Sequence, residues 1–169
     1  MRLVNRLPVH GDAISNLLDI KFDGIVRQKN DYSCGAAAIA TILRFSYYQV
    51  VDEDLILFEI MKDKSFSEAR TVLGEGVSLL DLKKVSRRFG VKAEGVKVSL
   101  SQISLVPVPF IARIRDDAGS NHFVVVKSIS STSVEMADSA RGLVVTTAGD
   151  FASQWADGAD EALVLMFDK

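Results

Sequence analysis

The chain has one cysteine, Cys34, in surroundings that suit a nucleophile. From Ala36 to Leu43 the residues are small or apolar with strong helix preference, and Asp31 and Ser33 are types that accept hydrogen bonds from free helical N–H groups. Cys34 is therefore expected in the first turn of a helix, where unpaired donors and the helix dipole stabilise a thiolate. A lone cysteine in an alanine-rich helix is more commonly a small buried side chain, so partners must decide between the two roles.

A histidine and an aspartate lie on two segments that are expected to form a hairpin. His122 opens an apolar strand and Asp138 ends the next one, with Ser130 and Ser131 at the turn between them. A hairpin folded about residue 130 or 131 places His122 directly across from Asp138 or Ser139. A carboxylate on one ring nitrogen fixes the tautomer and stabilises the imidazolium, and it leaves the other nitrogen for a thiol. This expected adjacency suggests a base and the residue that orients it, rather than a strand-end histidine and a turn aspartate.

Gln28 lies upstream of the cysteine and adds a hydrogen-bond donor. Its side-chain N–H and the backbone N–H of Cys34 could together bind the oxygen that becomes negative when a thiolate attacks a carbonyl. Taken singly, a glutamine before a helix is usually structural. Gly35 removes a side chain beside the nucleophile, so we expect a substrate backbone to approach closely there.

The apolar periodicity predicts helices first and strands afterwards. Helices are expected at 34–48, at 51–61 and at 79–89, where Ser78 caps the start. Short helical pieces are expected within 62–73, ended by the glycines Gly74 and Gly76, and at 99–104 and 150–155. Strands are expected at 91–98, 110–115, 122–129, 133–137, 142–147 and 162–167. This order favours an α+β fold, in which helices that carry the cysteine pack on an antiparallel sheet that carries the histidine and the aspartate. We interpret residues 1–169 as a single domain: an N-terminal arm at 1–19, a helical half at 20–90 and a sheet half at 91–169.

Two details of the helices also enter the prediction. In the 51–61 helix, either Leu55, Phe58 and Met61 or Ile56 and Ile60 form the inward stripe, and the acidic first turn, Asp52, Glu53 and Asp54, is expected in solvent. In the 79–89 helix, the basic face is expected to be a solvated surface because no aromatic residues alternate with its charges.

The composition excludes several classes of function. A single cysteine excludes an internal disulfide and a multi-thiolate metal site, and two histidines, His10 and His122, argue against a zinc site built from imidazoles. The net charge is −2 with charges interspersed, so nucleic acid is not expected as a partner. We also expect no cofactor. No apolar run approaches the roughly 18 residues of a membrane span, and residues 1–16 are too polar for a secretory signal. We assign no role to His10.

The chain shares these residues with a known family. It resembles the bacteriocin-processing cysteine peptidases, which are papain-like in fold and cut leader peptides after a double glycine. The resemblance runs from about residue 21 to residue 167 and rests on Gln28, the run Cys34–Ala38, the run Asn121–Phe123 and Asp138. Two positions differ from the family's frequent residues: Ser33 stands where Asp is common, and Ser139 stands where Pro often follows the orienting aspartate.

The resemblance implies a role for each of these residues. It implies Cys34 as nucleophile, His122 as base, Asp138 as orienting residue, Gln28 in the oxyanion hole, and Gly35 and Asn121 at the substrate. Many family members are the amino-terminal domain of a peptide-exporting ABC transporter. This sequence contains neither membrane spans nor an ATP-binding cassette, so we expect a stand-alone member that works beside a separate secretion machinery.

The leading hypothesis is a thiol-dependent peptidase that cleaves a peptide or protein, such as a double-glycine leader peptide or a secreted or envelope protein. The alternative is a peptidase-like module that binds a leader peptide or partner protein without cutting it. Acyl transfer to an amine would use the same residues and stays open. The compartment also stays open: the cell envelope or periplasm if a leader was removed, and otherwise the cytoplasm.

Overall fold

The computed structural model describes residues 17, 19–116, 118–155 and 160–168. The proposed arm at 1–19 and His10 therefore lie largely or wholly outside the described residues. The first half of the described chain is helical, with α2 (Cys34–Tyr47), α3 (Glu53–Met61), α4 (Phe66–Glu75) and α5 (Leu79–Arg88). The second half holds β1 (Ala93–Ser99), η1 (Leu100–Leu105), β2 (Phe110–Arg115), β3 (Asn121–Ile129), β4 (Ser133–Asp138), β5 (Gly142–Thr147), α6 (Ala148–Gln154) and β6 (Glu161–Phe167).

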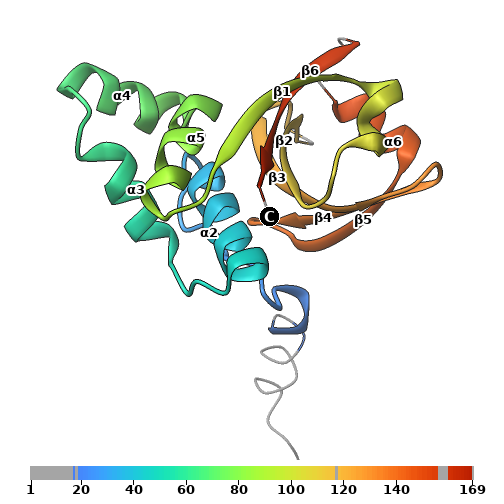
Figure 1. Cartoon of the computed structure of the whole chain (residues 1–169), viewed down its shortest axis with the longest axis horizontal. Helices are drawn as coiled ribbons and strands as arrows, with labels where there is room; N and C mark the ends of the chain where they lie inside the picture. Colours follow the sequence, from blue (N-terminus) through green and yellow to red (C-terminus); the bar gives the residue numbers. More distant parts are fainter. Residues whose placement is uncertain (1–16, 18, 117, 156–159, 169) are drawn as a thin grey trace, which may run out of the picture.

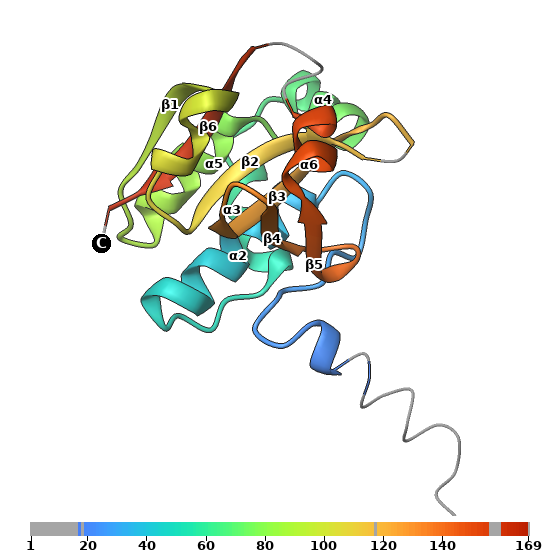
Figure 2. The ribbon, with the colours of Figure 1, turned by 90° about the vertical axis from the view of Figure 1, so that its right-hand side faces the viewer.

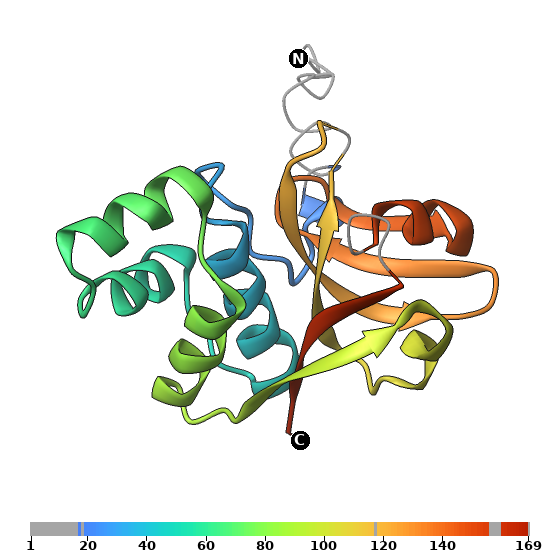
Figure 3. The ribbon, with the colours of Figure 1, turned by 90° about the horizontal axis from the view of Figure 1, so that it is seen from above.

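The strands form one antiparallel sheet in the order β1-β6-β2-β3-β4-β5. Figures 1 and 3 show α2, α3, α4 and α5 gathered on one side of this curved sheet, with α2 nearest to it, and α6 on the opposite side. In Figure 2 the edge strand β5 and the helix α6 that follows it face the viewer. The prediction of helices followed by an antiparallel sheet, an α+β arrangement, is confirmed.

Alternating strand residues divide the apolar side chains between two cores. Ile111, Phe123 and Val125 join the core that the sheet shares with α2, α3 and α5. Their neighbours Ala112 and Val124 face the opposite way, into a second core that η1 and α6 cover. The period of two along a strand produces this division, and it places the start of α2 directly against β3.

Most predicted elements are found within two residues of their expected ends, with local corrections in the helices. Helix α4 continues through Gly74 to Glu75, although the two glycines of this stretch predicted an earlier end. Helix α5 begins after a capping box at Ser78, as the sequence indicated. In α3 the inward stripe is Ile56 and Ile60, and the competing set that contains Leu55 and Phe58 is largely exposed.

The hairpin of β3 and β4 has a different register from the predicted one. Val125 pairs with Ala137, whereas Ser128 pairs with Glu135, and the register shifts between Val126 and Ser128. Continued to the end of β4, this register places Asp138 across from Val124 and diagonal to His122, so the prediction of a directly opposite pair was wrong. A displacement of two residues keeps each side chain on its face, and diagonal neighbours are still within reach of long side chains.

Gly35 is buried in the first turn of α2, where the helix meets β3 and the start of α5. A Cβ at this position would overlap the Cγ2 methyl of Val77 and lie 3.1 Å from Phe123 Cδ2 and 3.2 Å from Leu82 Cδ2. The space that we expected for a substrate backbone is therefore filled by protein side chains. The glycine allows α2 to pack closely, and it holds the neighbouring Cys34 against the sheet.

We expect Gly35→Ala to lower the free energy of unfolding by about 1–3 kcal/mol, because the new methyl group has no room. Gly74→Ala is the matched control, since it also lies in a helix and a Cβ there meets nothing within 4 Å. The control should gain up to about 1 kcal/mol from helix preference. Urea unfolding followed by circular dichroism measures both variants, and an equal change in the two would contradict the packing argument.

Candidate active site

Asp138 and His122 form a buried pair at the ends of β4 and β3. His122 Nε2 lies 3.0 Å from Asp138 Oδ1, with side-chain exposures of 10% and 0%. The backbone N–H of Ala140 donates to the same oxygen at 2.8 Å, and Arg141 Nε donates to the other oxygen at 2.7 Å. Burial alone would raise the pKa of Asp138, but the bonds from His122, Arg141 and Ala140 hold that pKa well below its usual range. The predicted adjacency of the two side chains is therefore confirmed, although the register is not.

Cys34 is the first residue of α2, as predicted, and its side chain lies close enough to the ring of His122 to affect the pKa of that ring. Because Nε2 faces Asp138, Nδ1 is the ring nitrogen that remains for the sulfur. Burial lowers the pKa of His122, but the hydrogen bonds and negative charges of Asp138 and Cys34 outweigh burial and raise the pKa from 6.5 to about 9. The ring is therefore protonated at neutral pH and can stabilise a thiolate beside it.

Ser33 precedes the nucleophile as the N-cap residue, yet its hydroxyl turns away from the helix. Ser33 Oγ donates to the backbone oxygen of Asn30 at 2.7 Å, and within the described chain it makes no side-chain cap hydrogen bond to α2. The expectation that this side chain accepts from the helical N–H groups was wrong. Its hydroxyl therefore does not occupy the first-turn donors, which include the N–H of Cys34.

Gln28 is half-buried and lies beside the residue that follows Asp138. Its Oε1 accepts from Ser139 Oγ at 2.7 Å, and its Nε2 donates to the backbone oxygen of Asn30 at 3.2 Å. The backbone N–H of Gln28 donates to the carbonyl of Ser139 at 3.0 Å. An amide nitrogen carries two hydrogens, so the bond to Asn30 uses only one of them.

Glu53 belongs to the site's support, and our sequence reasoning missed it. Its side chain was expected in solvent, but the residue is 1% exposed, and both carboxylate oxygens accept from the backbone N–H of Lys29 at 3.0 and 3.1 Å. This contact fixes the segment between Gln28 and Cys34. An acidic residue in a helical first turn usually faces water, so nothing in the local pattern separates Glu53 from its neighbours Asp52 and Asp54.

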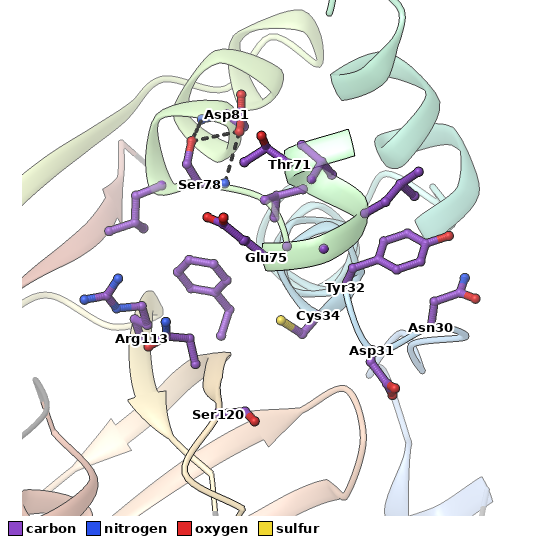
Figure 4. Close-up of a pocket in the computed structure, with 18 of the residues that line it drawn as sticks. Asn30, Asp31, Tyr32, Cys34, Thr71, Glu75, Ser78, Asp81, Arg113 and Ser120 are labelled. Carbon is purple, nitrogen blue, oxygen red and sulfur yellow. Dashed lines mark hydrogen bonds between the residues drawn. The ribbon is translucent and has the colours of Figure 1, made fainter. Parts of the chain in front are cut away.

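Cys34 lies on the wall of an open cleft of about 1520 Å³ between the helical and sheet parts of the described chain. Figure 4 shows its sulfur at the centre of the cleft, between the segment of Asp31 and Tyr32 and the strand of Arg113. The last turns of α4, which include Leu73, and the α4–α5 connection, which includes Val77, form a third wall. Asn121 lines the cleft from the start of β3. The sulfur is thus accessible to an extended ligand although Cys34 itself is only 5% exposed.

Metal ligands and membrane spans were also sought in the described residues. No group of three or more His, Cys, Asp or Glu residues there could hold a metal ion. The helices of those same ranges are all too short or too polar to cross a bilayer.

The model of the Peptidase C39 family matches residues 23–165, which span both halves and every residue of the site. The chain belongs to the peptidase C39 family. It is 31% identical to the probable functional amyloid protease FapD of Pseudomonas fluorescens over 84% of this chain and 61% of that protein. It is 26% identical to the lactococcin-G-processing and transport ATP-binding protein LagD of Lactococcus lactis, over 86% of this chain and 18% of LagD. The chain thus spans about three-fifths of the length of its FapD relatives.

Solved structures of the same family share the fold. A double glycine motif protease from an AMS/PCAT transporter, solved with its leader peptide, superposes with a TM-score of 0.69 at 22% identity, covering 85% of this chain and 89% of that one. The peptidase domain of Streptococcus ComA gives a TM-score of 0.66 at 17% identity, covering 85% and 96%. The resemblance to papain-like, bacteriocin-processing cysteine peptidases is therefore confirmed for family and fold.

We expect NMR titration to show a histidine ring signal, absent from the His122→Ala variant, with a pKa of about 9. Asp138→Asn and Cys34→Ala should each move this pKa downward, because each removes a negative charge and a hydrogen bond that favour the protonated ring. A His122 signal that titrates near pH 6.5 and ignores both substitutions would show that the three groups do not interact.

Proposed function

We propose that this chain hydrolyses peptide bonds with Cys34 as nucleophile, His122 as acid and base, Asp138 as orienting residue and Gln28 as oxyanion donor. The observation that carries the proposal is that His122, whose Nε2 lies 3.0 Å from Oδ1 of the buried Asp138, also interacts with Cys34 on the cleft wall. Membership of the peptidase C39 family gives this geometry its chemical context.

The reaction follows from the protonation states of the pair. The thiolate of Cys34 attacks the carbonyl carbon of the scissile bond, and the carbonyl oxygen becomes an anion. The N–H of Cys34 and the remaining amide hydrogen of Gln28 bind this oxygen, and one such donor is typically worth about 100-fold to 1000-fold in rate. His122 then gives its proton to the departing amine, which leaves an acyl group on the sulfur.

Release reverses the roles of the ring. His122, now neutral, takes a proton from a water molecule as that water attacks the thioester, and the tetrahedral intermediate collapses to a carboxylic acid and the thiolate. Asp138 keeps Nε2 occupied through both steps, so Nδ1 always faces the reacting atoms. Because Asp138 is fully buried and held by Arg141 and Ala140, it can neutralise the imidazolium without moving.

The substrate class follows from access to the sulfur. Cys34 and His122 are only 5% and 8% exposed. The substrate residues on either side of the scissile bond must therefore have small side chains for the carbonyl to reach the sulfur. Glycine meets this requirement, and the relatives include a double glycine motif protease that was solved with a leader peptide. We therefore assign a leader peptide that ends in Gly-Gly, on a secreted peptide or protein, as the substrate. Asn121 lines the cleft beside His122 and is assigned to substrate contact.

Replacing the nucleophile gives the direct test of the activity. Cys34→Ala should abolish turnover of a peptide substrate with an unchanged circular dichroism spectrum, since no other residue of the site can form the acyl intermediate. Continued cleavage by the pure variant would reject the mechanism. A wild-type Cys34 that does not react with iodoacetamide at mildly acidic pH, together with no release of product, would instead support the peptide-binding module.

A matched pair of peptides tests the substrate class. A leader peptide that ends in Gly-Gly should be cleaved with a kcat/KM at least about tenfold higher than the same peptide with Val-Val, because β-branched side chains cannot follow the backbone to the recessed sulfur. Mass spectrometry of the products locates the cut. Equal cleavage of both peptides would leave the peptidase activity intact and remove the double-glycine assignment.

A further inference from the structure

Ser139 connects the acid–base pair to the oxyanion side of the site. It lies in the turn between β4 and β5, directly after Asp138, and is 3% exposed. Its hydroxyl donates to Gln28 Oε1 at 2.7 Å, and its carbonyl accepts from the backbone N–H of Gln28 at 3.0 Å. Gln28 comes from the opposite half of the chain, 111 residues away in sequence. One residue therefore holds Gln28 at two points.

The orientation of the Gln28 amide decides what this side chain offers a substrate. If the amide nitrogen of Gln28 faces the cleft, it can donate a hydrogen bond to an oxyanion. If the amide oxygen faces the cleft, it repels the oxyanion. The carbonyl of Asn30 can only accept, so it requires the amide nitrogen on its side, and the Ser139 hydroxyl then donates to the oxygen on the other. The two bonds select the same orientation.

The main chain around Gln28 leaves only its side chain to be fixed. The N–H of Gln28 is bound to Ser139, and the next N–H, of Lys29, is bound by the buried carboxylate of Glu53. A long glutamine side chain still has rotatable bonds that a half-exposed position does not restrain. The hydroxyl of Ser139 supplies that restraint from a buried, fixed turn.

We propose that Ser139 is a positioning residue, whose hydroxyl holds the Gln28 amide with its nitrogen directed at the developing oxyanion. This inference rests on the proposed role of Gln28. It also gives the segment Asp138–Ser139 two tasks, since its first residue orients the imidazole and its second orients the oxyanion donor.

Ser139→Ala tests the inference through steady-state kinetics. We expect kcat to fall by about 5-fold to 20-fold, a fraction of the effect of losing an oxyanion donor altogether, while KM changes little. The rate of Cys34 alkylation by iodoacetamide should stay unchanged, because alkylation develops no oxyanion. Ser139→Thr, which keeps the hydroxyl, should retain kcat within about threefold. Ser139→Gly gives a second removal of the hydroxyl if the alanine variant does not fold.

Ser86→Ala is the matched control for lost stability. Ser86 is also a fully buried serine, and its Oγ donates to the carbonyl of Leu82 at 2.7 Å within α5, outside the site. Both alanine variants lose one buried hydrogen bond and should be destabilised to a similar extent. Only Ser139→Ala should lose kcat, and an equal loss of kcat in Ser86→Ala would overturn the inference.

The double variant separates this inference from the proposed function. Gln28→Ala alone should cost about 100-fold to 1000-fold in kcat, and adding Ser139→Ala should cost nothing more. Two results would overturn the role of Ser139 and leave that of Gln28 intact. The first is a wild-type kcat in Ser139→Ala when Gln28→Ala is slow. The second is a double variant whose loss of kcat equals the product of the losses in the two single variants. An unimpaired Gln28→Ala would instead remove the oxyanion role on which the inference rests.

Discussion

The buried carboxylate of Asp138 is the constraint on which the site depends. A charge with no exposed surface must be compensated where it lies, and here the imidazolium of His122, the guanidinium of Arg141 and backbone N–H groups do so. Because these partners bind both carboxylate oxygens, they fix the position of the carboxylate. The hydrogen bond to Asp138 therefore fixes the orientation of the His122 ring, and Nδ1 is the nitrogen left for the sulfur of Cys34.

The site requires the helical and sheet parts to stay in fixed relation, and several tight contacts achieve this. Gly35 lets the first turn of α2 pack directly against Phe123 and Val77. Ser139 ties the sheet to Gln28, and Glu53 ties α3 to the same segment through Lys29. The cleft lies between the helical and sheet parts, and these contacts hold its two walls together. Cys34 belongs to the helical part and His122 to the sheet part, so these contacts set how the two proposed catalytic groups lie relative to each other.

Two serine hydroxyls, those of Ser33 and Ser139, support the segment around Gln28. The chain shares its fold with double-glycine leader peptidases at about one-fifth sequence identity. The hydroxyl of Ser33 donates to the carbonyl of Asn30, and the hydroxyl of Ser139 donates to the Gln28 side chain. Both hydroxyls thus help to hold the segment from which the proposed oxyanion donor, Gln28, extends.

The sequence by itself determined the elements and the chemistry, because these depend on short-range patterns. Helix preference and end position placed Cys34 in a first turn, the period of two placed His122 and Asp138 on paired strands, and local capping placed the start of α5 at Ser78. Those signals need no knowledge of distant residues.

Only the tertiary structure decided the roles that depend on what packs where. Glu53 is buried because Lys29 presents a main-chain N–H to it, Gly35 lacks a side chain because Val77 occupies the space, and the Ser33 hydroxyl turns to Asn30 instead of capping the helix. The register of β3 and β4 likewise differs from the predicted one, because the pairing shifts between Val126 and Ser128. The turn residues between the two strands do not indicate this shift. Contacts between residues far apart in sequence produce no periodic pattern in the sequence, so only the folded structure identifies the residues that make them.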